Sequence, residues 1–208
     1  MTTASVVGEW VRIRKRFFEW RINAVLVHKL SLAMGAACLT GLLAQTRVYL
    51  PFTPVPVTGQ TFAALLAGVA LGARWGGVSQ ILYVGLGLAG VPWFSGWTGG
   101  VAAVAGPTGG YIIGFVLAAF LVGYFTDKYP GARSFPALIG LMLLGNFAVI
   151  HAFGLLHLAG WLAVASGAAP SMTDVFAAGT LPFIPGDLLK VFAAAAAGFM
   201  ILPKTGSR

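Results

Sequence analysis

The sequence predicts an all-α integral membrane protein with six transmembrane helices. Of its 208 residues, 58% are hydrophobic and only 9% are charged, whereas soluble domains average roughly 25% charged residues. Apolar segments of about 20 residues, the length needed to cross a bilayer, follow one another along the chain. The basic residues lie at the ends of these segments, where they set orientation in the membrane. The net charge of +8 therefore does not indicate nucleic-acid binding.

The first element is predicted to be a basic amphipathic helix. Its apolar residues recur at spacings of three and four, which places them on one helical face: Trp10, Ile13, Phe17, Trp20, Ala24 and Val27. Basic residues occupy the rest of the circumference: Arg12, Lys15, Arg16 and Arg21. Helices of this kind lie in a membrane interface, so residues 1–28 are interpreted as a cytoplasmic arm. An unstructured charged leader is the alternative.

Six transmembrane segments follow the arm and form a membrane domain over residues 29–203, before a short tail at 204–208. Their predicted ranges are 29–47, 58–73, 75–92, 107–126, 135–160 and 182–202. One side of the membrane receives most of the basic residues: the arm, Arg74, Lys128, Arg133, Lys204 and Arg208. The other side receives Arg47 alone. This bias predicts a multi-pass protein of the cytoplasmic (inner) membrane with both termini inside.

The three outer connections, at 48–57, 93–106 and 161–181, contain no basic residue. The first reads VYLPFTPVPV, and its prolines favour extended backbone. The second reads WFSGWTGGVAAVAG and continues into PTGGYIIG, where glycines permit tight turns and close approach to a ligand. Extended backbone cannot face lipid, but it can cover a bundle or a water-filled mouth. The connections thus indicate a covered outer pocket, with plain loops as the alternative.

Asp187 and Lys190 are the strongest candidates for a binding site. They lie in LPFIPGDLLK, where Pro182 and Pro185 mark a helix start. A spacing of i and i+3 puts both charges on one face, at depths of roughly 7 and 12 Å into the segment. Charges within a membrane segment usually face a cavity and mark a functional site. The pair suits a small polar ligand, and a purely structural ion pair is the alternative.

The remaining polar residues within the spans are few. Gln80 and Tyr83 lie one turn apart and are expected to face the same cavity. We expect Asn146, His151 and His157 to form hydrogen bonds with neighbouring helices. These scattered histidines do not predict a metal site.

The sequence also contains regularly spaced small residues, and it lacks several motifs of enzymes. Ala33 and Ala37 lie four residues apart, a spacing that suits either packing within the bundle or docking of a partner helix. The sequence contains no G-x-x-x-x-G-K-[ST] motif, so it has no P-loop for ATP. No motif marks a catalytic nucleophile, and no cofactor is expected.

Three blocks together closely resemble the BioY family, the biotin-specific S components of energy-coupling-factor (ECF) transporters. They are PFTPVPVTGQTFAALLAG (51–68), GPTGGYIIGFVLAAFLVG (106–123) and LPFIPGDLLK (181–190), with LYVGLGLAGVPWFSGWTGG (82–100) as a fourth. The resemblance implies a six-helix S-component bundle with an outer pocket gated by the loop after the first span. It also implies a non-enzymatic subunit that works with a transmembrane coupling protein and cytoplasmic ATPases. Asp187 and Lys190 would contact the biotin head group, and Ala33 and Ala37 would dock the coupling protein.

The chemistry of biotin agrees with this resemblance. Its ureido ring offers two N–H donors to Asp187 and a carbonyl acceptor to Lys190, and Gln80 is included among the pocket residues. An apolar sleeve for the fused ring and tail is expected from Phe52, Val57, Tyr83 and Trp93. Donors for the tail carboxylate are expected from Thr53, Thr58 and the backbone N–H groups of Gly99–Gly100 or of Thr108, Gly109 and Gly110.

Two departures and several alternatives accompany this reading. Gly59 stands where the family commonly has a larger apolar residue, and the arm is longer than the family minimum. The alternatives are a facilitator that works alone, an S component for another small vitamin, a membrane enzyme with Asp187 as base, and a scaffold that binds no small ligand.

Overall fold

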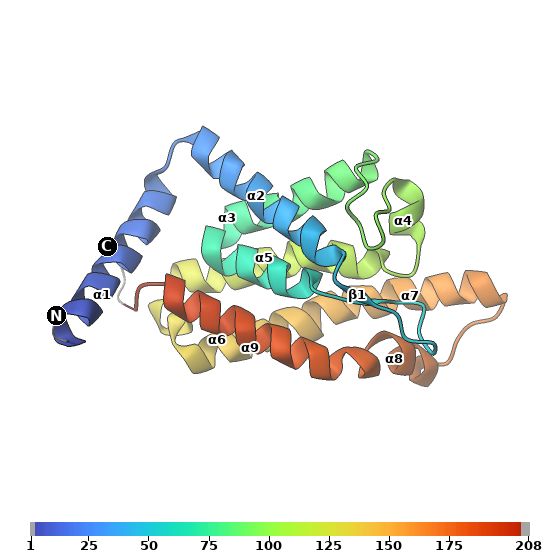
Figure 1. Cartoon of the computed structure of the whole chain (residues 1–208). Coiled ribbons are helices and arrows are strands. Elements are labelled where there is room, and N and C mark those ends of the chain that lie inside the picture. Colours follow the sequence, from blue (N-terminus) through green and yellow to red (C-terminus); the bar gives the residue numbers. More distant parts are fainter. Residues whose placement is uncertain (1–2, 205–208) are drawn as a thin grey trace.

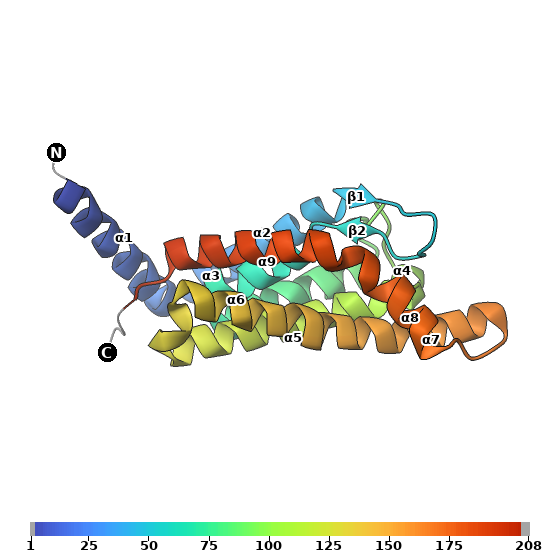
Figure 2. The same ribbon diagram turned by 90° about the horizontal axis from the view of Figure 1, so that it is seen from below.

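The structure is an elongated bundle of helices whose axes run mainly in one direction (Figure 1). It is a computed structural model that describes residues 3–204, with side chains from Gly8 onward. The predicted tail beyond residue 204 and the first two residues of the arm lie outside this range. The two ends of the described chain lie at the same end of the bundle in both views (Figures 1 and 2).

Five continuous helical stretches within the described residues are long and apolar enough to cross a membrane. Two are single helices without an internal change of helix type: α2 (Leu26–Ala44) and α5 (Gly109–Lys128). A third begins as α8 (Met172–Gly179), passes through a 3-10 turn, η3 (Leu181–Phe183), and continues as α9 (Ile184–Ile201). One stretch begins as α6 (Phe135–Leu143), passes through a π-helix, η2 (Leu144–Ile150), and continues as α7 (His151–Ser166). It extends six residues beyond the predicted end at 160.

The fifth stretch, α3 (Gln60–Leu88), is a helical hairpin that supplies two of the six predicted segments. Its chain reverses at Gly72, whose φ of +80° and ψ of 177° are accessible almost only to glycine. Because the two halves run back along each other, Gln60 Nε2 donates to the hydroxyl of Tyr83 at 2.6 Å. The bundle therefore contains the six membrane segments that the sequence predicts.

The arm, α1 (Thr3–Asn23), is helical as predicted but differs in extent and orientation. It ends at Asn23, and α2 starts at Leu26 after an extended Val25, so Ala24 and Val27 do not belong to its apolar face. The face turned toward the bundle carries Arg14, Phe18 and Arg21, whereas Trp10, Ile13 and Trp20 are exposed. Arg21 lies off the apolar face, as the sequence predicts, but its side chain is buried against the end of the bundle.

Arg21 joins α1 to the hairpin turn. Its guanidinium donates to the carbonyls of Val69 and Ala70 at 3.1 Å and to Asp127 Oδ1 at 2.5 Å. The other oxygen of Asp127 accepts from the backbone N–H of Ala73 at 2.9 Å. Arg21 and Asp127 thus satisfy the unpaired groups that a helix end and a helix start leave at Gly72. Burial lowers the pKa of Arg21, and the neighbouring carboxylate of Asp127 opposes this shift.

The outer connections contain more regular structure than expected. The first begins and ends in a two-stranded antiparallel pair, β1 (Arg47–Val48) and β2 (Val57–Thr58). The second contains α4 (Val101–Ala105), and the third contains α8 (Met172–Gly179) and the 3-10 turn η3 (Leu181–Phe183). Another 3-10 turn, η1 (Pro130–Arg133), joins α5 to α6 at the opposite end. Figure 2 shows the β1–β2 loop beside α8 and α9.

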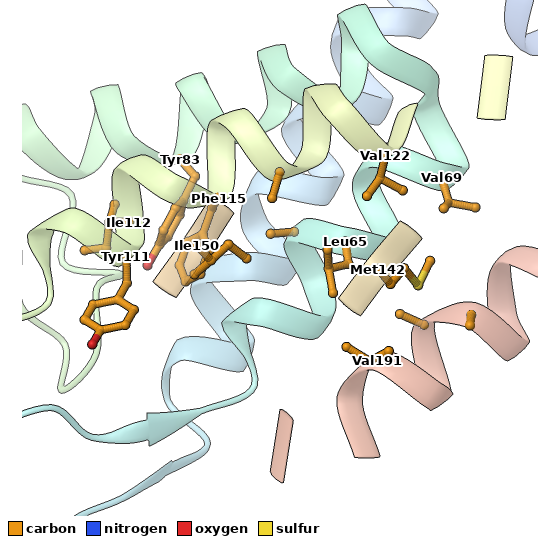
Figure 3. Close-up of a cluster of buried hydrophobic side chains, with 14 of the residues drawn as sticks. Leu65, Val69, Tyr83, Tyr111, Ile112, Phe115, Val122, Met142, Ile150 and Val191 are labelled. Carbon is orange, nitrogen blue, oxygen red and sulfur yellow. The ribbon is translucent and has the colours of Figure 1, made fainter. Parts of the chain in front are cut away.

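Small residues allow the central helices to pack closely. A Cβ atom at Gly68 would lie only 2.4 Å from the carbonyl oxygen of Ala119, so α3 and α5 approach at backbone distance there. A cluster of buried apolar side chains lies between α3, α5, η2 and α9. Figure 3 shows it extending from Tyr111 and Ile112 at one end to Val69 and Val122 at the other.

Ala33 and Ala37 belong to this packing. Both are completely buried, and the main neighbour of α2 is α3. The side of α2 that remains exposed carries Leu30, Met34 and Leu42 instead. Of the two roles considered for the small residues, packing within the bundle is the one this structure shows. The docking role that the resemblance implies for these two alanines stays a prediction.

Candidate ligand-binding site

A small cavity lies where the start of α9 meets α5, the η2–α7 junction and the β1–β2 loop. Residues from all these elements form its wall: Val55, Pro56, Thr58, Gln60, Thr61, Thr108, Tyr111, Ile112, Phe115, Ile150, His151, Phe183, Asp187 and Lys190. Its volume of about 40 Å³ is well below the roughly 300–1,000 Å³ typical of small-molecule pockets. The cavity as it stands therefore accommodates water-sized groups, and a larger guest requires one wall to move.

Asp187 is the most highly connected side chain of the cavity. It is 2% exposed and lies in the first turn of α9. Its Oδ1 accepts from Lys190 Nζ at 2.7 Å, and its Oδ2 accepts from His151 Nε2 at 2.8 Å and from Asn146 Nδ2 at 3.0 Å. The carboxylate is therefore not paired with Lys190 alone, as a purely structural ion pair would be.

His151 links Asp187 to the segment that precedes α9. Its Nδ1 lies 2.9 Å from the hydroxyl of Thr180, and the residue is 3% exposed. A neutral imidazole with its proton on Nε2 donates to Asp187 and accepts from Thr180. With the imidazole neutral, the charges of Asp187 and Lys190 balance each other, which lowers the cost of burying them.

The π-helix brings Asn146 and His151 to the same carboxylate. The two residues are five positions apart, and the backbone N–H of His151 bonds to the carbonyl of Asn146. In an α-helix, residues five apart point to different sides, whereas the wider π turn aligns them. Both residues bond a neighbouring helix, as the sequence predicts. Their place at the site could not be predicted, because a π turn leaves no spacing signal in the sequence.

Aromatic side chains enclose the buried end of the cavity. The ring of Tyr111 meets His151 edge-on at 5.7 Å between centroids, and Phe183 lies 6.2 Å from the same imidazole. The hydroxyl of Tyr111 donates to the carbonyl of Gly179 at 2.7 Å, so its polar end is satisfied away from the cavity. Phe115 and Ile150 lie close together behind it (Figure 3). These walls suit a flat, largely apolar ring system.

The β1–β2 loop closes the cavity on its outer side. Val55, 4% exposed, and Pro56 form part of the wall. The hydroxyl of Thr53 donates to the carbonyl of Ala178 at 2.7 Å, which ties the loop to α8. The same hydroxyl accepts from the N–H of Val55 at 3.1 Å. Thr53 therefore holds the covering segment in place instead of pointing into the cavity.

Four of the predicted ligand-binding residues line the cavity: Asp187, Lys190, Thr58 and Thr108. Thr58 donates to Gln60 Oε1 at 2.7 Å, and Gln60 in turn donates to Tyr83. Tyr83 therefore does not line the cavity itself but bonds Gln60, which does.

The other predicted residues lie elsewhere. Gln80 is completely buried and bonds Thr40 Oγ1 at 3.2 Å, because its side chain turns toward α2. Trp93 donates its indole N–H to the carbonyl of Tyr83 at 2.9 Å. Phe52 is 66% exposed at the tip of the loop.

Three further positions have backbone or strand roles in this structure. Val57 pairs with Val48 in the β1–β2 ladder. Gly100 is the N-cap of α4 with a φ of +83°, and Gly109 begins α5 with its Cα against the carbonyl of Val104. Within residues 3–204 no group of three or more His, Cys, Asp or Glu side chains is arranged to hold a metal ion.

Comparison with known proteins agrees with this arrangement. Residues 14–205 match the sequence pattern of the BioY family. The chain is 47% identical over 139 residues to a probable biotin transporter BioY of Methanothermobacter thermautotrophicus, covering 67% of this chain and 88% of that protein. It is 33% identical over 175 residues to the biotin transporter BioY of Rhizobium etli, covering 82% and 90% respectively.

A solved structure shares the fold. The crystal structure of the S-component for biotin from an ECF-type ABC transporter superposes with a TM-score of 0.74 at 30% sequence identity, over 88% of this chain and 95% of that one. With the family pattern spanning nearly the whole described chain, the fold and the sequence lead to one conclusion. This multi-pass membrane protein belongs to the BioY family.

Proposed function

We propose that this chain is the biotin-binding S component of an ECF-type biotin transporter. The observation that carries the proposal is the bonding capacity left over at the cavity. An ionised carboxylate offers about four lone-pair sites, and Asp187 uses three of them within the described chain. An ammonium offers three donors, and Lys190 uses one of them on Asp187.

A ureido ring matches this remaining capacity. Its two N–H groups find acceptors at the free site of Asp187 and at Asn146 Oδ1, a buried atom without a hydrogen-bond partner among the described residues. Its carbonyl oxygen finds the free donors of Lys190. Bonds to charged groups in a dry site are shorter and stronger than neutral ones. Tyr111, Phe115 and Phe183 supply the apolar surface for the fused ring.

Binding requires the cavity to enlarge. The β1–β2 loop is the wall that can move, because the single Thr53–Ala178 hydrogen bond and the burial of Val55 hold it over the site. Displacement of the loop enlarges the cavity on that side. Thr58 and Thr108 line it there and can donate to the biotin carboxylate. Phe52, Val57 and Trp93 lie on or beside this loop, and we propose that they line the tail once it has moved. Gln80 and Tyr83 then remain behind the residues that line the cavity.

Isothermal titration of the purified chain with biotin and with 2-iminobiotin tests the proposal. We expect one biotin to bind per chain. The imino analogue, which replaces the carbonyl with a nitrogen that protonates, should bind at least ten times more weakly because it offers Lys190 no acceptor. Equal affinities for the two compounds would contradict the assignment of the ureido ring to Asp187 and Lys190.

Transport is proposed to need an ECF coupling protein and ATPases, because the sequence carries no P-loop of its own. These ATPases act from the cytoplasm, and the orientation follows from the basic residues. Arg21 and Arg74 line one hollow together, and Arg133 lines another beside Lys204, the last described residue. We propose that the end of the bundle with these residues faces the cytoplasm, by the positive-inside rule, and that the cavity opens outward.

A green fluorescent protein fused after the C-terminus tests the orientation, since this reporter folds in the bacterial cytoplasm and not after export through the general secretion route. Bright cells are expected. Dark cells with a stably inserted fusion would reverse the assignment.

A further inference from the structure

The described surface includes a second, larger hollow, at the opposite end of the bundle from the cavity. It lies between α1 and the last turns of α9 and has a volume of about 540 Å³. Its lining is almost wholly apolar: Trp10, Ile13, Phe17, Ala197, Met200 and Ile201, with Arg14 as the one charged member. We refer to it as the arm groove. Figures 1 and 2 show α1 lying across the end of the bundle beside α9.

Arg14 gives the arm groove a polar end. It is 8% exposed, and its guanidinium donates to the carbonyls of Phe199 and Leu202, the former at 2.5 Å. Its Nε is buried and has no hydrogen-bond partner among the described residues. A buried guanidinium N–H without an acceptor is costly. Arg14 therefore brings one positive charge to a lining that is otherwise apolar, which suits an occupant with an anionic group at one end and an apolar body along the rest.

The position of the groove in the membrane narrows the choice of occupant. α9 is one of the membrane-crossing stretches and ends at Ile201, so the groove lies at the boundary between hydrocarbon and head groups. The adjoining face of α1 carries exposed Arg12 and Arg16, while Lys15 makes only a 3.8 Å pair with Glu19. Basic residues near the cytoplasmic surface favour anionic lipids by about 1 kcal/mol each.

We propose that the arm groove binds one anionic phospholipid. An acyl chain lies along Trp10, Ile13 and Met200, and the phosphate lies beside the part of Arg14 that lines the groove. Arg12 and Arg16 interact with the charge of the head group. The bound lipid adds to the interface between α1 and the bundle, which Arg14 and Arg21 already hold through bonds within the chain. This site is separate from the cavity and does not depend on the proposed biotin function.

Native mass spectrometry of the full chain tests the site, with phosphatidylglycerol and phosphatidylcholine of identical acyl chains added in equal amounts. We expect the wild type to retain one phosphatidylglycerol in at least fivefold preference. Ala197→Trp should abolish this retention by filling the groove. Ala193→Trp makes the same change one turn away on α9, at an exposed position outside the groove, and should leave retention unchanged. Thermal unfolding midpoints establish that both variants fold.

If Ala197→Trp fails to fold, phosphatidylglycerol with brominated acyl chains provides a second measurement. The contribution of Trp10 to the fluorescence is the difference between the wild type and Trp10→Phe. In detergent micelles this contribution should be quenched by the brominated phosphatidylglycerol, and at least fivefold less by brominated phosphatidylcholine. Each of three results would overturn the proposal. They are equal retention of the two lipids by the wild type, equal lipid retention by Ala197→Trp and Ala193→Trp, and fluorescence of Trp10 that the brominated lipid does not quench.

Discussion

Asp187→Ala is expected to abolish biotin binding and to destabilise the protein. The carboxylate accepts three hydrogen bonds within the described chain, from Lys190, His151 and Asn146. Its removal leaves the partly buried ammonium of Lys190 without its partner. Breaking a fully buried pair costs about 3–5 kcal/mol, so a loss near the lower end of that range is expected. Affinity should fall at least a hundredfold, because the ureido N–H groups lose an ionised acceptor and Lys190 loses its orientation. Titration calorimetry measures the affinity, and thermal unfolding measures the stability.

The amide variant separates the two effects. Asp187→Asn keeps the size of the side chain but removes the charge, so it should fold better than Asp187→Ala and still bind biotin at least tenfold more weakly than the wild type. Asp174→Asn is the matched control, since Asp174 is an exposed carboxylate in the first turn of α8. Wild-type affinity in Asp187→Asn would remove the carboxylate from the binding site.

Arg21→Ala is expected to cause the largest loss of stability at the other end of the bundle. The residue is 5% exposed and bonds two carbonyls of the hairpin turn as well as Asp127. Its guanidinium also lies 4.4 Å from the centre of the Phe18 ring. Hydrogen bonds to charged groups contribute about 1.5–3 kcal/mol each. Because Asp127 is 37% exposed as a side chain, that pair is partly screened, and a total loss of about 3 kcal/mol is expected.

A matched arginine on the same helix makes this prediction specific. Arg16 is exposed, so Arg16→Ala should change the unfolding midpoint in detergent very little. Arg21→Ala should lower it by several degrees and should also expose the linker between α1 and α2 to limited proteolysis. If the two variants unfold alike, Arg21 does not hold the arm on the bundle, and the carbonyls at Gly72 are satisfied by other means.

The membrane segments could be predicted from the sequence because they depend on local properties. The length of an apolar run, the positions of basic residues and the prolines before α9 are read directly from the chain, and the structure confirms the six segments. The i, i+3 spacing of Asp187 and Lys190 was sufficient to place both on one face, and they do line one cavity. The choice of these two residues needed only the α-helical repeat and the cost of charge within a membrane.

The rest of the cavity wall was not available from local patterns. Gln80 and Tyr83 were expected at the cavity because they lie one turn apart, but the hairpin at Gly72 turns Gln80 toward α2 and places Tyr83 behind Gln60. Asn146 and His151 reach Asp187 through a π-helix. Their spacing of five residues has no meaning on the α-helical repeat.

The sequence by itself determined how many times the chain crosses the membrane, which end is basic and which charges share a face. The tertiary structure alone decided which faces meet: that Ala33 and Ala37 pack on α3, that Arg21 closes the hairpin turn, and that Asn146 and His151 complete the site. The reason is physical. Transfer into a membrane depends on each segment separately, whereas the partner of a buried side chain depends on how neighbouring helices fit together.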